Sequence, residues 1–538
     1  MLRRNFDIAA LLILPLAFLA VQIATRNHAL PYWLEINFDP AYTYLPSGLM
    51  VLEGVTPTFF QHPGTPVEVL VALVAWAMGF GAPGHVADAA FAHGEAILRA
   101  ASDVIIALET IALATLGWTA RLRIGALLPA LFAQTAPFMT ILGLKHGIGV
   151  KPEPMLLLAV VLLSIAMIEE WHRPRPGSTL AMAFAVGFGT ACKITFAPLG
   201  LAPLFLLHGW NRRIAYGALA LLFFALCIAP VWGDFAAMSG WFGAIAAHNG
   251  DYGGGAATVL DPRRFTAGFV KLFFSRPIYL IVYGAGIAAL IWRRRERRAA
   301  GAAASLGERA LLGMLLAQLA QMLMAAKQPS AHYVLPALEW AGPTAAFVWI
   351  VAGETVALDR FRVPVRRAFA LVLALILVVQ GWGAFRVDRE LRAQSAASLS
   401  IDLAREFPGC AHLYRNFASS PAEAWFYSLP YGAGHFAARL APLIPEDDYF
   451  MIPWRDREIH SWTGTVTMDA LAAGYPCIAL RGIEPEALRA IGLAFGAAFD
   501  RGAICRLGDE TIVLRYRSAD QPRFAALPQS CAADPGPQ

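Results

Sequence analysis

Two carboxylates lie in short polar segments between long apolar runs, and each is held beside proline. Asp39 precedes Pro40, and Glu153 lies between Pro152 and Pro154. Charged groups at the edge of a membrane cost free energy, so such residues are candidates for function. A carboxylate on a rigid support can act as a general base or bind a divalent cation. Either carboxylate could instead only cap the helix that follows it.

Basic and aromatic side chains occur in the same kind of segment. They are His62, Arg99, Lys145, Lys151, Lys193, Lys327, His332 and Tyr333. Lysine binds phosphate as a point charge, so this set predicts a site for a phosphate headgroup. Single members have simpler explanations: a histidine in a turn can be inert, and Lys193 could extend from a span toward the headgroups. Together with Asp39 and Glu153, His62 could also ligate Mg²⁺, Mn²⁺ or Zn²⁺.

The composition indicates the setting of these residues. Of 538 residues, 57% are hydrophobic and 15% are charged, and the mean hydropathy is +0.53. A water-soluble chain would carry about 25% charged residues. The apolar residues form blocks near the roughly 20 residues that cross a bilayer as a helix. The sequence therefore predicts an all-α polytopic membrane protein.

The basic residues set the predicted topology. They cluster in short patches between apolar blocks, as in cytoplasmic loops, so the net charge of +5 does not suggest nucleic acid. Eleven spans are predicted, with the N-terminus cytoplasmic: about 7–25, 96–119, 124–143, 154–171, 178–191, 194–209, 214–231, 272–292, 307–325, 334–352 and 368–385. The first span shows no convincing cleavage site and is interpreted as uncleaved. Segment 26–95 is then a large first outer loop, within a transmembrane domain of residues 1–386.

The tail, residues 387–538, has ordinary composition and is predicted to be a small periplasmic α/β domain. Strands are expected at 411–414, 477–480 and 511–516, and an amphipathic helix at 485–497. Four of the six cysteines lie here, and an oxidising outer compartment would permit disulfides. They are Cys410, Cys477, Cys505 and Cys531. The spacing does not fix their connectivity.

Several short motifs resemble those of the GT-C class of membrane glycosyltransferases. These are Asp39-Pro40-Ala41-Tyr42, His62-Pro63-Gly64-Thr65-Pro66, Lys151-Pro152-Glu153-Pro154 and His332-Tyr333-Val334-Leu335-Pro336. The arrangement resembles the family 39 type, which is related to protein O-mannosyltransferases and lipid A aminoarabinose transferases. The glycine-rich segment around Tyr252 resembles an outer loop of this group. The resemblance covers roughly residues 1–390, and the tail matches only loosely.

The resemblance implies an inverting transferase in the bacterial inner membrane. It would move a sugar from a polyprenyl phosphate donor to a glycan, lipid or protein acceptor on the outer face. Asp39 would be the general base and Glu153 the second acidic residue, while His62, Arg99 and the lysines, with His332 and Tyr333, would hold the donor phosphate. Tyr42 and Tyr252 would face the acceptor. Better-known members often carry adjacent acidic residues where Pro40 follows Asp39 here, so metal dependence stays open.

Three other functions fit a polytopic chain of this composition. A lipid or glycan transporter or flippase would place polar residues at mid-membrane and show repeated span patterns. Glu109, Gln318 and Gln321 lie within predicted spans, but no repeat is evident. An O-antigen ligase-type transferase would use a diphosphate-linked glycan and place its main outer loop late in the chain. A non-catalytic assembly subunit would recognise its ligand through the tail.

Overall fold

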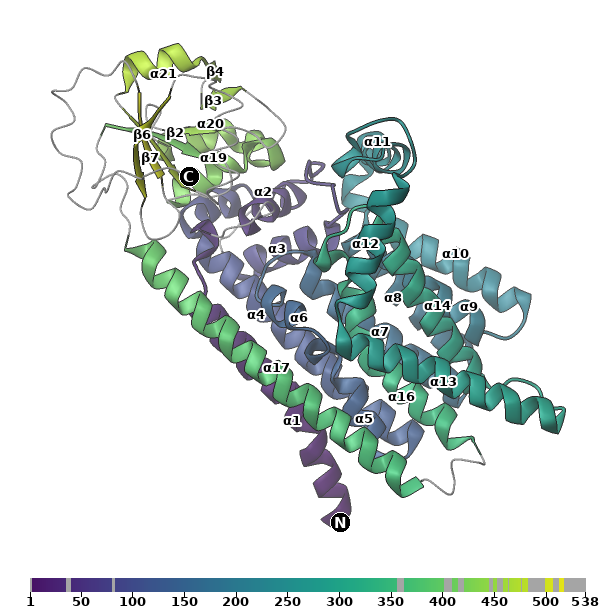
Figure 1. The fold of residues 1–538 in the computed structure, drawn as a ribbon. Helices are drawn as coiled ribbons and strands as arrows, with labels where there is room; N and C mark the ends of the chain where they lie inside the picture. Colours follow the sequence, from purple (N-terminus) through teal and green to yellow (C-terminus); the bar gives the residue numbers. More distant parts are fainter. Residues whose placement is uncertain are drawn as a thin grey trace. The chain divides into compact units, whose positions relative to one another are not determined.

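Helices make up most of this computed structural model, and a mixed sheet follows them near the C-terminus (Figure 1). The structure describes residues 2–34, 40–79, 83–355, 362–400, 409–414, 420–444, 449–451, 458–462, 464–475, 477–481, 499–506 and 512–516. Asp39, Cys531 and the helix predicted at 485–497 lie outside these residues.

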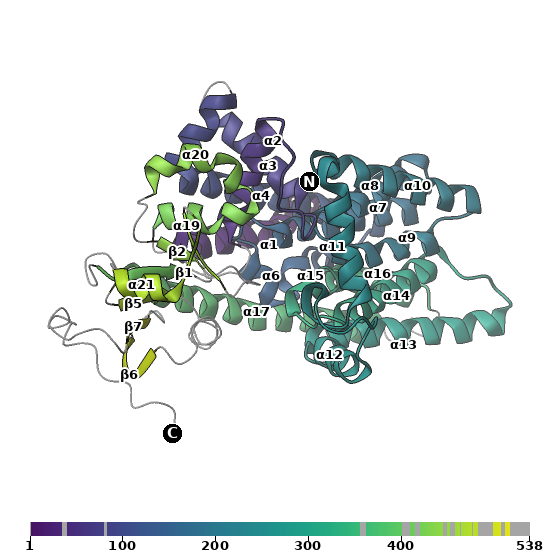
Figure 2. The same ribbon diagram turned by 90° about the horizontal axis from the view of Figure 1, so that it is seen from above.

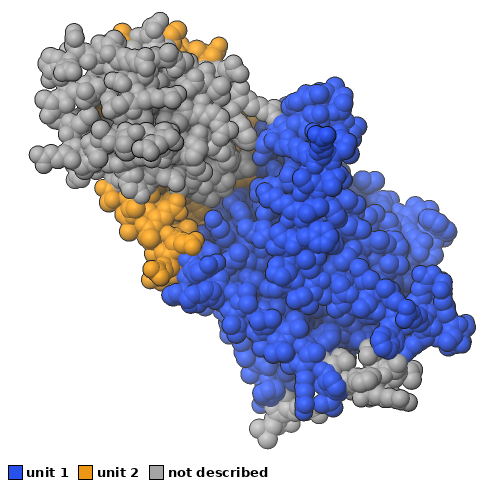
Figure 3. All heavy atoms as spheres, viewed as in Figure 1, with its two compact units in different colours: residues 1–25, 60–70, 100–387 blue, residues 26–59, 71–99, 388–538 orange. Residues whose placement is uncertain are grey.

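The chain divides into two compact units (Figure 3). Unit 1 comprises residues 1–25, 60–70 and 100–387, and unit 2 comprises residues 26–59, 71–99 and 388–538. Unit 2 thus combines most of the predicted first outer loop with the tail. These are units of packing, and the division into domains 1–386 and 387–538 stays a prediction.

Unit 1 is a helical bundle. Its helices, four of which continue into unit 2, are α1 (Leu2–His28), α3 (Thr65–Ala77), α4 (Pro83–Ile124), α5 (Leu127–Gln134), α6 (Ile141–His146), α7 (Pro152–His172), α8 (Pro176–Cys192), α9 (Leu201–Leu206), α10 (Trp210–Cys227), α11 (Phe235–Ala247), α12 (Pro262–Phe274), α13 (Pro277–Ala300), α14 (Leu306–Ala326), α15 (Leu335–Glu339), α16 (Ala341–Gly353) and α17 (Arg362–Leu399). Helix α8 packs between α7 and α10 (Figure 2), and α14 contacts α9, α12 and α16. The core includes Trp340, which is fully buried and donates a hydrogen bond from Nε1 to Ser164 Oγ (3.0 Å).

Five helical segments among the described residues are long and apolar enough to cross a membrane. They are 5–28, 152–172, 306–326, 331–353 and 366–399. Two further pairs, α10 with 229–247 and α12 with α13, qualify if each bent pair is one span, which gives up to seven. The chain is thus a multi-pass membrane protein of the predicted helical class, although the count differs from the predicted eleven.

Broken helices account for much of that difference. The span predicted at 124–143 is built from α5, a 3₁₀ turn at Ala136–Phe138 and α6, and the one at 194–209 from a 3₁₀ segment, Ile194–Gly200, followed by α9. The pair around residue 228 bends by 82°, and the pair around residue 275 by 87°. Proline lies at the start of α12 and of α13, where its missing N–H costs no helical hydrogen bond. An apolar run indicates a segment buried in lipid, but it does not show whether that segment is one straight helix.

Unit 2 contains a seven-stranded mixed sheet with the order β4-β3-β2-β1-β5-β7-β6. The strands are β1 (Ala411–Tyr414), β2 (Tyr449–Met451), β3 (Ile459–Ser461), β4 (Gly464–Val466), β5 (Cys477–Arg481), β6 (Phe499–Arg506) and β7 (Ile512–Tyr516). Strand β1 pairs in parallel with β2 and β5, and the other pairs are antiparallel. The three strands predicted from the sequence are therefore present as β1, β5 and β7.

Helices from the first outer segment and from the tail pack on each other inside unit 2. Helix α2 (Ala41–Leu52) carries Tyr42, whose ring lies edge-on to Trp425 of α19 (Pro421–Tyr427), with centroids 5.3 Å apart. Trp425 also contacts the Phe91 ring (5.3 Å) and donates from Nε1 to the Phe91 carbonyl (3.3 Å). Arg439 binds Glu53 and Asp88. These contacts explain why segments far apart in the sequence form one unit.

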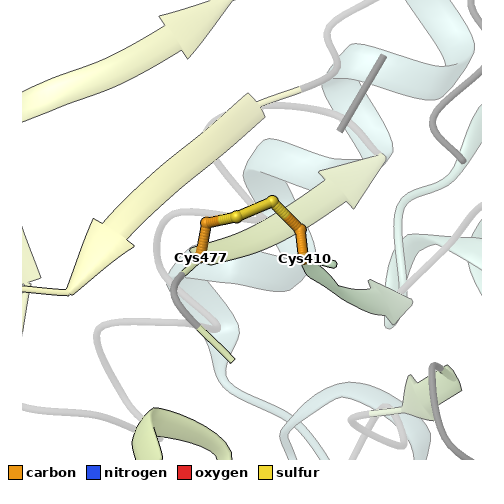
Figure 4. Close-up of a disulfide and its surroundings, with 2 residues drawn as sticks. All are labelled: Cys410 and Cys477. Atoms are coloured by element: carbon orange, nitrogen blue, oxygen red, sulfur yellow. A yellow bond between two sulfur atoms is a disulfide. The ribbon is translucent and has the colours of Figure 1, made fainter. Parts of the chain in front are cut away.

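A disulfide joins Cys410, just before β1, to Cys477 at the start of β5 (Figure 4). The two strands are neighbours in the sheet, so their first residues come within reach of each other. The spacing of the cysteines could not select this pair from the four in the tail. The cysteines outside the tail, Cys192 and Cys227, are both free.

Candidate functional site

A buried ion pair between Glu153 and Lys193 is the centre of the candidate site in unit 1. The Lys193 Nζ lies 2.5 Å from Glu153 Oε1, and the two side chains are 3% and 7% exposed. Glu153 lies in the first turn of α7, after Pro152, where the helix dipole favours a negative charge. Lys193 therefore does not extend from its span toward the lipid headgroups, which was the simpler explanation offered for it.

The backbone around Lys193 is fixed by the His62-Pro63-Gly64 turn. Lys193 follows the last residue of α8 in an extended conformation and forms a β-bridge with Pro63. The Ile194 N–H donates to the His62 carbonyl (2.9 Å), and the Gly64 N–H donates to the carbonyls of residues 191 and 192 (3.1 and 3.2 Å). Gly64 has a φ of +78°, a conformation that glycine adopts without steric cost. The histidine motif thus positions the lysine through the main chain.

Further basic side chains lie near the pair. The basic groups that act electrostatically on Glu153 are Lys193, Lys151, His332 and His146. Lys151 is 8% exposed, and the rings of His146 and His332 lie 5.9 Å apart between centroids. Burial first, and then the charge of Lys151, hold the pKa of His146 well below its usual range. We call Glu153, Lys193, Lys151, His146 and His332 the charged cluster.

Two tyrosines adjoin the charged cluster. The Lys193 Nζ lies 4.9 Å from the centroid of the Tyr333 ring, a cation–π geometry. The Tyr333 hydroxyl lies 3.4 Å from the Tyr252 hydroxyl of the glycine-rich segment after α11. Tyr252 has a φ of +53°, which is uncommon for a residue other than glycine. Of the two residues proposed to face the acceptor, Tyr252 therefore reaches the edge of the cluster.

Mid-span amides support this arrangement. The Gln321 Nε2 donates to the carbonyls of Thr195 and Tyr333 (2.9 and 3.2 Å), and the Gln318 Nε2 donates to Thr344 Oγ1 (2.7 Å). Both glutamines are buried in α14. Gln321 thus links the segment after Lys193 to the segment that carries Tyr333. Both glutamines thus form hydrogen bonds with other protein groups, which indicates a structural role.

The other predicted site residues are not in the charged cluster. Lys327 donates to the Ala246 carbonyl at the end of α11 (2.7 Å), and Lys145 is exposed on α6. Arg99 belongs to unit 2 and pairs with Glu95 (2.7 Å), and Tyr42 is 1% exposed against Trp425. The proposed catalytic base, Asp39, lies outside the described residues.

Sequence reasoning missed one buried carboxyl near the site. Glu339, at the end of α15, is 1% exposed and acts electrostatically on Glu153 and Glu109. Glu339 Oε2 has no hydrogen-bond partner among the residues that the structure covers. The sequence signal for Glu339 was its position as a single acidic residue within the predicted span 334–352.

The described donors do not favour a divalent cation. Glu153, the one proposed metal ligand whose carboxylate is described, is paired with a lysine and lies among cationic groups. No group of three histidine, cysteine, aspartate or glutamate residues suited to a metal is found within the ranges described. A second positive ion beside Lys193 and Lys151 would be repelled at short range.

Comparison with solved structures identifies the fold. The crystal structure of ArnT from Cupriavidus metallidurans bound to undecaprenyl phosphate matches with a TM-score of 0.51 and 13% sequence identity, over 94% of this chain and 99% of that one. The chain shares the fold of ArnT. The apo structure of ArnT from the same organism matches with a TM-score of 0.48 and 13% identity, over 93% and 97% of the two chains. The likeness to ArnT confirms the fold that the motifs predicted.

No family model matches the chain, and no curated protein sequence does. At 13% identity the match to ArnT concerns the fold, so function has to be argued from the charged cluster.

Proposed function

We propose that the chain is a glycosyltransferase of the GT-C type that takes a sugar from a polyprenyl phosphate donor. The observation that carries the proposal is the charged cluster, in which two buried lysines and two histidines surround a single ion-paired carboxylate. Polar groups at a membrane edge are costly unless a ligand uses them. A phosphate monoester is an anion that the lysines of this cluster can bind.

Lysine is suited to this ligand because its compact ammonium binds phosphate as a point charge. Lys193 is held in place by the β-bridge to Pro63 and by the Tyr333 ring. His332 lies beside Tyr333, with ring centroids 4.3 Å apart, and can add a hydrogen bond to a phosphate oxygen. We therefore assign Lys151, Lys193, His332 and Tyr333 to the donor phosphate.

The shared fold supports the class of donor. ArnT was crystallised with undecaprenyl phosphate, a polyprenyl monophosphate with a long apolar tail. In this chain the charged cluster belongs to a helical bundle whose outer surface carries large exposed apolar side chains, such as Leu221 (71%) and Leu371 (71%). A lipid-anchored donor can reach such a site from the bilayer.

The proposed reaction needs one general base and little acid catalysis. The acceptor hydroxyl attacks the anomeric carbon, the bond from that carbon to the phosphate oxygen breaks, and the polyprenyl phosphate leaves with the bonding electrons. The hydroxyl proton passes to Asp39, the carboxylate of the first outer segment. General-base catalysis of this kind contributes about a hundredfold to ten-thousandfold in rate. The cluster's cations stabilise the charge on the departing phosphate.

The test uses the full chain in lipid nanodiscs with labelled polyprenyl phosphate-sugars and outer-envelope fractions. Transfer is expected from a monophosphate donor. Asp39→Asn should lower transfer about a hundredfold or more while donor binding remains. Asp88→Asn is a matched control, because Asp88 lies in the same segment in an exposed ion pair with Arg439, and transfer should persist.

Further measurements distinguish the proposed function from the alternative functions. Transfer only from a diphosphate-linked glycan would indicate an O-antigen ligase-type enzyme. EDTA should leave transfer unchanged, because Lys193 pairs with Glu153, a proposed metal ligand. Unaltered transfer in Asp39→Asn, or no transfer from any lipid-linked sugar, would refute the proposed mechanism.

A further inference from the structure

The ion pair between Glu153 and Lys193 differs from another buried carboxylate pair of unit 1, that of Glu170 with Arg212. Glu170, 1% exposed, accepts hydrogen bonds from Ser178 Oγ, from the N–H of Arg175 and from both terminal nitrogens of Arg212. Glu153 accepts one recorded hydrogen bond within the described residues, from Lys193. Glu170 is thus anchored from several sides, whereas Glu153 is anchored through a single contact.

A buried carboxylate with one hydrogen-bond partner has few directional contacts. Removing a carboxylate from water costs several kcal/mol, which is recovered only with good geometry and additional hydrogen bonds. Within the described residues Glu153 has no second recorded hydrogen bond, and the positive charge of Lys151 also acts at this site. An anion with more charge and more acceptor oxygens can therefore compete with Glu153 for Lys193.

Both partners are fixed at the backbone, and they differ in the contacts of their side chains. Lys193 is fixed at its backbone by the bridge to Pro63, and its amine lies over the Tyr333 ring. Glu153 is fixed at its backbone by the first turn of α7, and its one recorded hydrogen bond among the described residues is to Lys193. Exchange of partners at Lys193 therefore needs only a rotation of the Glu153 side chain.

We propose that Glu153 occupies the phosphate position on Lys193 until a donor arrives, and that the donor phosphate displaces it. The displaced carboxylate then turns toward the sugar next to the phosphate and accepts a hydrogen bond from a sugar hydroxyl. The inference rests on the proposed function, since it assigns the cluster to a prenyl monophosphate. It gives Glu153 two roles. In the empty site Glu153 competes with phosphate for Lys193, and in the filled site it binds the sugar.

The binding experiment uses farnesyl monophosphate, a short polyprenyl phosphate, titrated calorimetrically into the full chain in detergent. Glu153→Gln removes the competing charge, so the affinity should rise about tenfold or more. Lys193→Met should lower the affinity at least about tenfold, since it removes a charge-assisted hydrogen bond to the phosphate. Glu170→Gln, the matched control, should leave the affinity within about twofold. An unchanged or weaker affinity in Glu153→Gln overturns the proposal.

A variant of the neighbouring Glu339 distinguishes displacement of Glu153 from Lys193 from a general effect of charge on phosphate binding. Glu339 acts electrostatically on Glu153 but has no recorded bond to Lys193 among the described residues. Glu339→Gln should change farnesyl monophosphate affinity far less than Glu153→Gln does. An equal gain in both variants means that overall charge, and not occupation of Lys193, controls binding, which also overturns the proposal.

A spectroscopic measurement does not depend on how the variants fold. Infrared difference spectra of the wild-type chain, with and without farnesyl monophosphate, should show a shifted carboxylate stretch as Glu153 leaves Lys193. Glu153→Asp, with its shorter side chain, should show a smaller shift. A wild-type difference spectrum without a carboxylate band contradicts the exchange.

Transfer kinetics distinguish this inference from the proposed function. Glu153→Gln should lower both KM and kcat, because the donor binds more tightly while the sugar loses its ligand. A chain that shows the predicted binding changes but transfers no sugar would contradict the transferase assignment alone. A chain that transfers sugar with unchanged binding in Glu153→Gln would contradict the exchange alone.

Discussion

At the scale of single residues, the charged cluster shows how burial and neighbouring charge assign different states to similar side chains. Lys193 and Glu153 neutralise each other inside the bundle. His146 lies beside Lys151, and both burial and that positive charge favour its neutral form. The cluster can thus hold a permanent cation, a displaceable carboxylate and a neutral imidazole close together.

The state of His146 predicts a pH dependence of stability. The pKa of His146 is held well below the usual range in the folded chain, whereas a histidine in an unfolded chain has a pKa of about 6.5. The unfolded state therefore binds more protons below that pH, and folding stability falls as the pH drops from about 7 to 5. His146→Gln should lose less of its Tm over this range than wild type.

The control for this prediction is His208→Gln, since His208 is exposed. That variant should follow the wild-type dependence of Tm on pH. Parallel curves for His146→Gln and wild type would show that His146 does not contribute to the pH dependence.

At the scale of elements, the site depends on segments that interrupt regular helices. Lys193 lies in an extended residue between α8 and a 3₁₀ segment, and the His62-Pro63-Gly64 turn precedes α3. The backbone groups freed by these interruptions bind each other in the β-bridge. Irregular backbone at membrane depth is tolerated where protein groups satisfy its hydrogen bonds.

The turn gives a prediction at this scale. Gly64 has a φ of +78°, so Gly64→Ala should cost about 1–2 kcal/mol and displace the backbone that holds Lys193. Both the Tm and the affinity for farnesyl monophosphate should fall. Gly177→Ala, in the first turn of α8 with open space around it, should be neutral or slightly stabilising. Equal behaviour of the two variants would show that the turn does not position the site.

At the scale of the whole molecule, each unit is assembled from distant parts of the sequence. Unit 2 is held by aromatic contacts of Trp425 with Tyr42 and Phe91, and by the ion pairs of Arg439. Tyr42, proposed as an acceptor contact, is buried in this packing, and the surrounding apolar groups raise the pKa of its hydroxyl above the ordinary range. Its position favours a structural role over binding.

Trp425 should therefore be essential for the integrity of unit 2. The residue is 2% exposed, and Trp425→Ala should destabilise the unit by about 3–5 kcal/mol. Thermal unfolding and limited proteolysis would measure the loss, with new cleavage expected in residues 26–59 and 388–538. Trp382→Ala, which removes a tryptophan 62% exposed on α17, should leave the cleavage pattern unchanged. A protease-resistant Trp425→Ala would contradict this account of the unit.

The local sequence determined the class of the chain and the identity of many candidate residues. Apolar runs and basic patches identified a helical membrane protein, and short strand-like segments in the tail identified β1, β5 and β7. Prolines around Glu153 marked a carboxylate at the start of a helix. These features depend on neighbouring residues only, because a span in lipid leaves a continuous apolar run and a short strand leaves a local pattern of residue types.

The tertiary structure alone decided which of these residues act together. The partnership of Glu153 with Lys193 joins the start of α7 to the end of α8, and the bridge to Pro63 adds a turn from far earlier in the chain. The same holds for Cys410 with Cys477 and for Tyr42 with Trp425. Such contacts arise from packing between elements, and their energies depend on burial and geometry that no local pattern records.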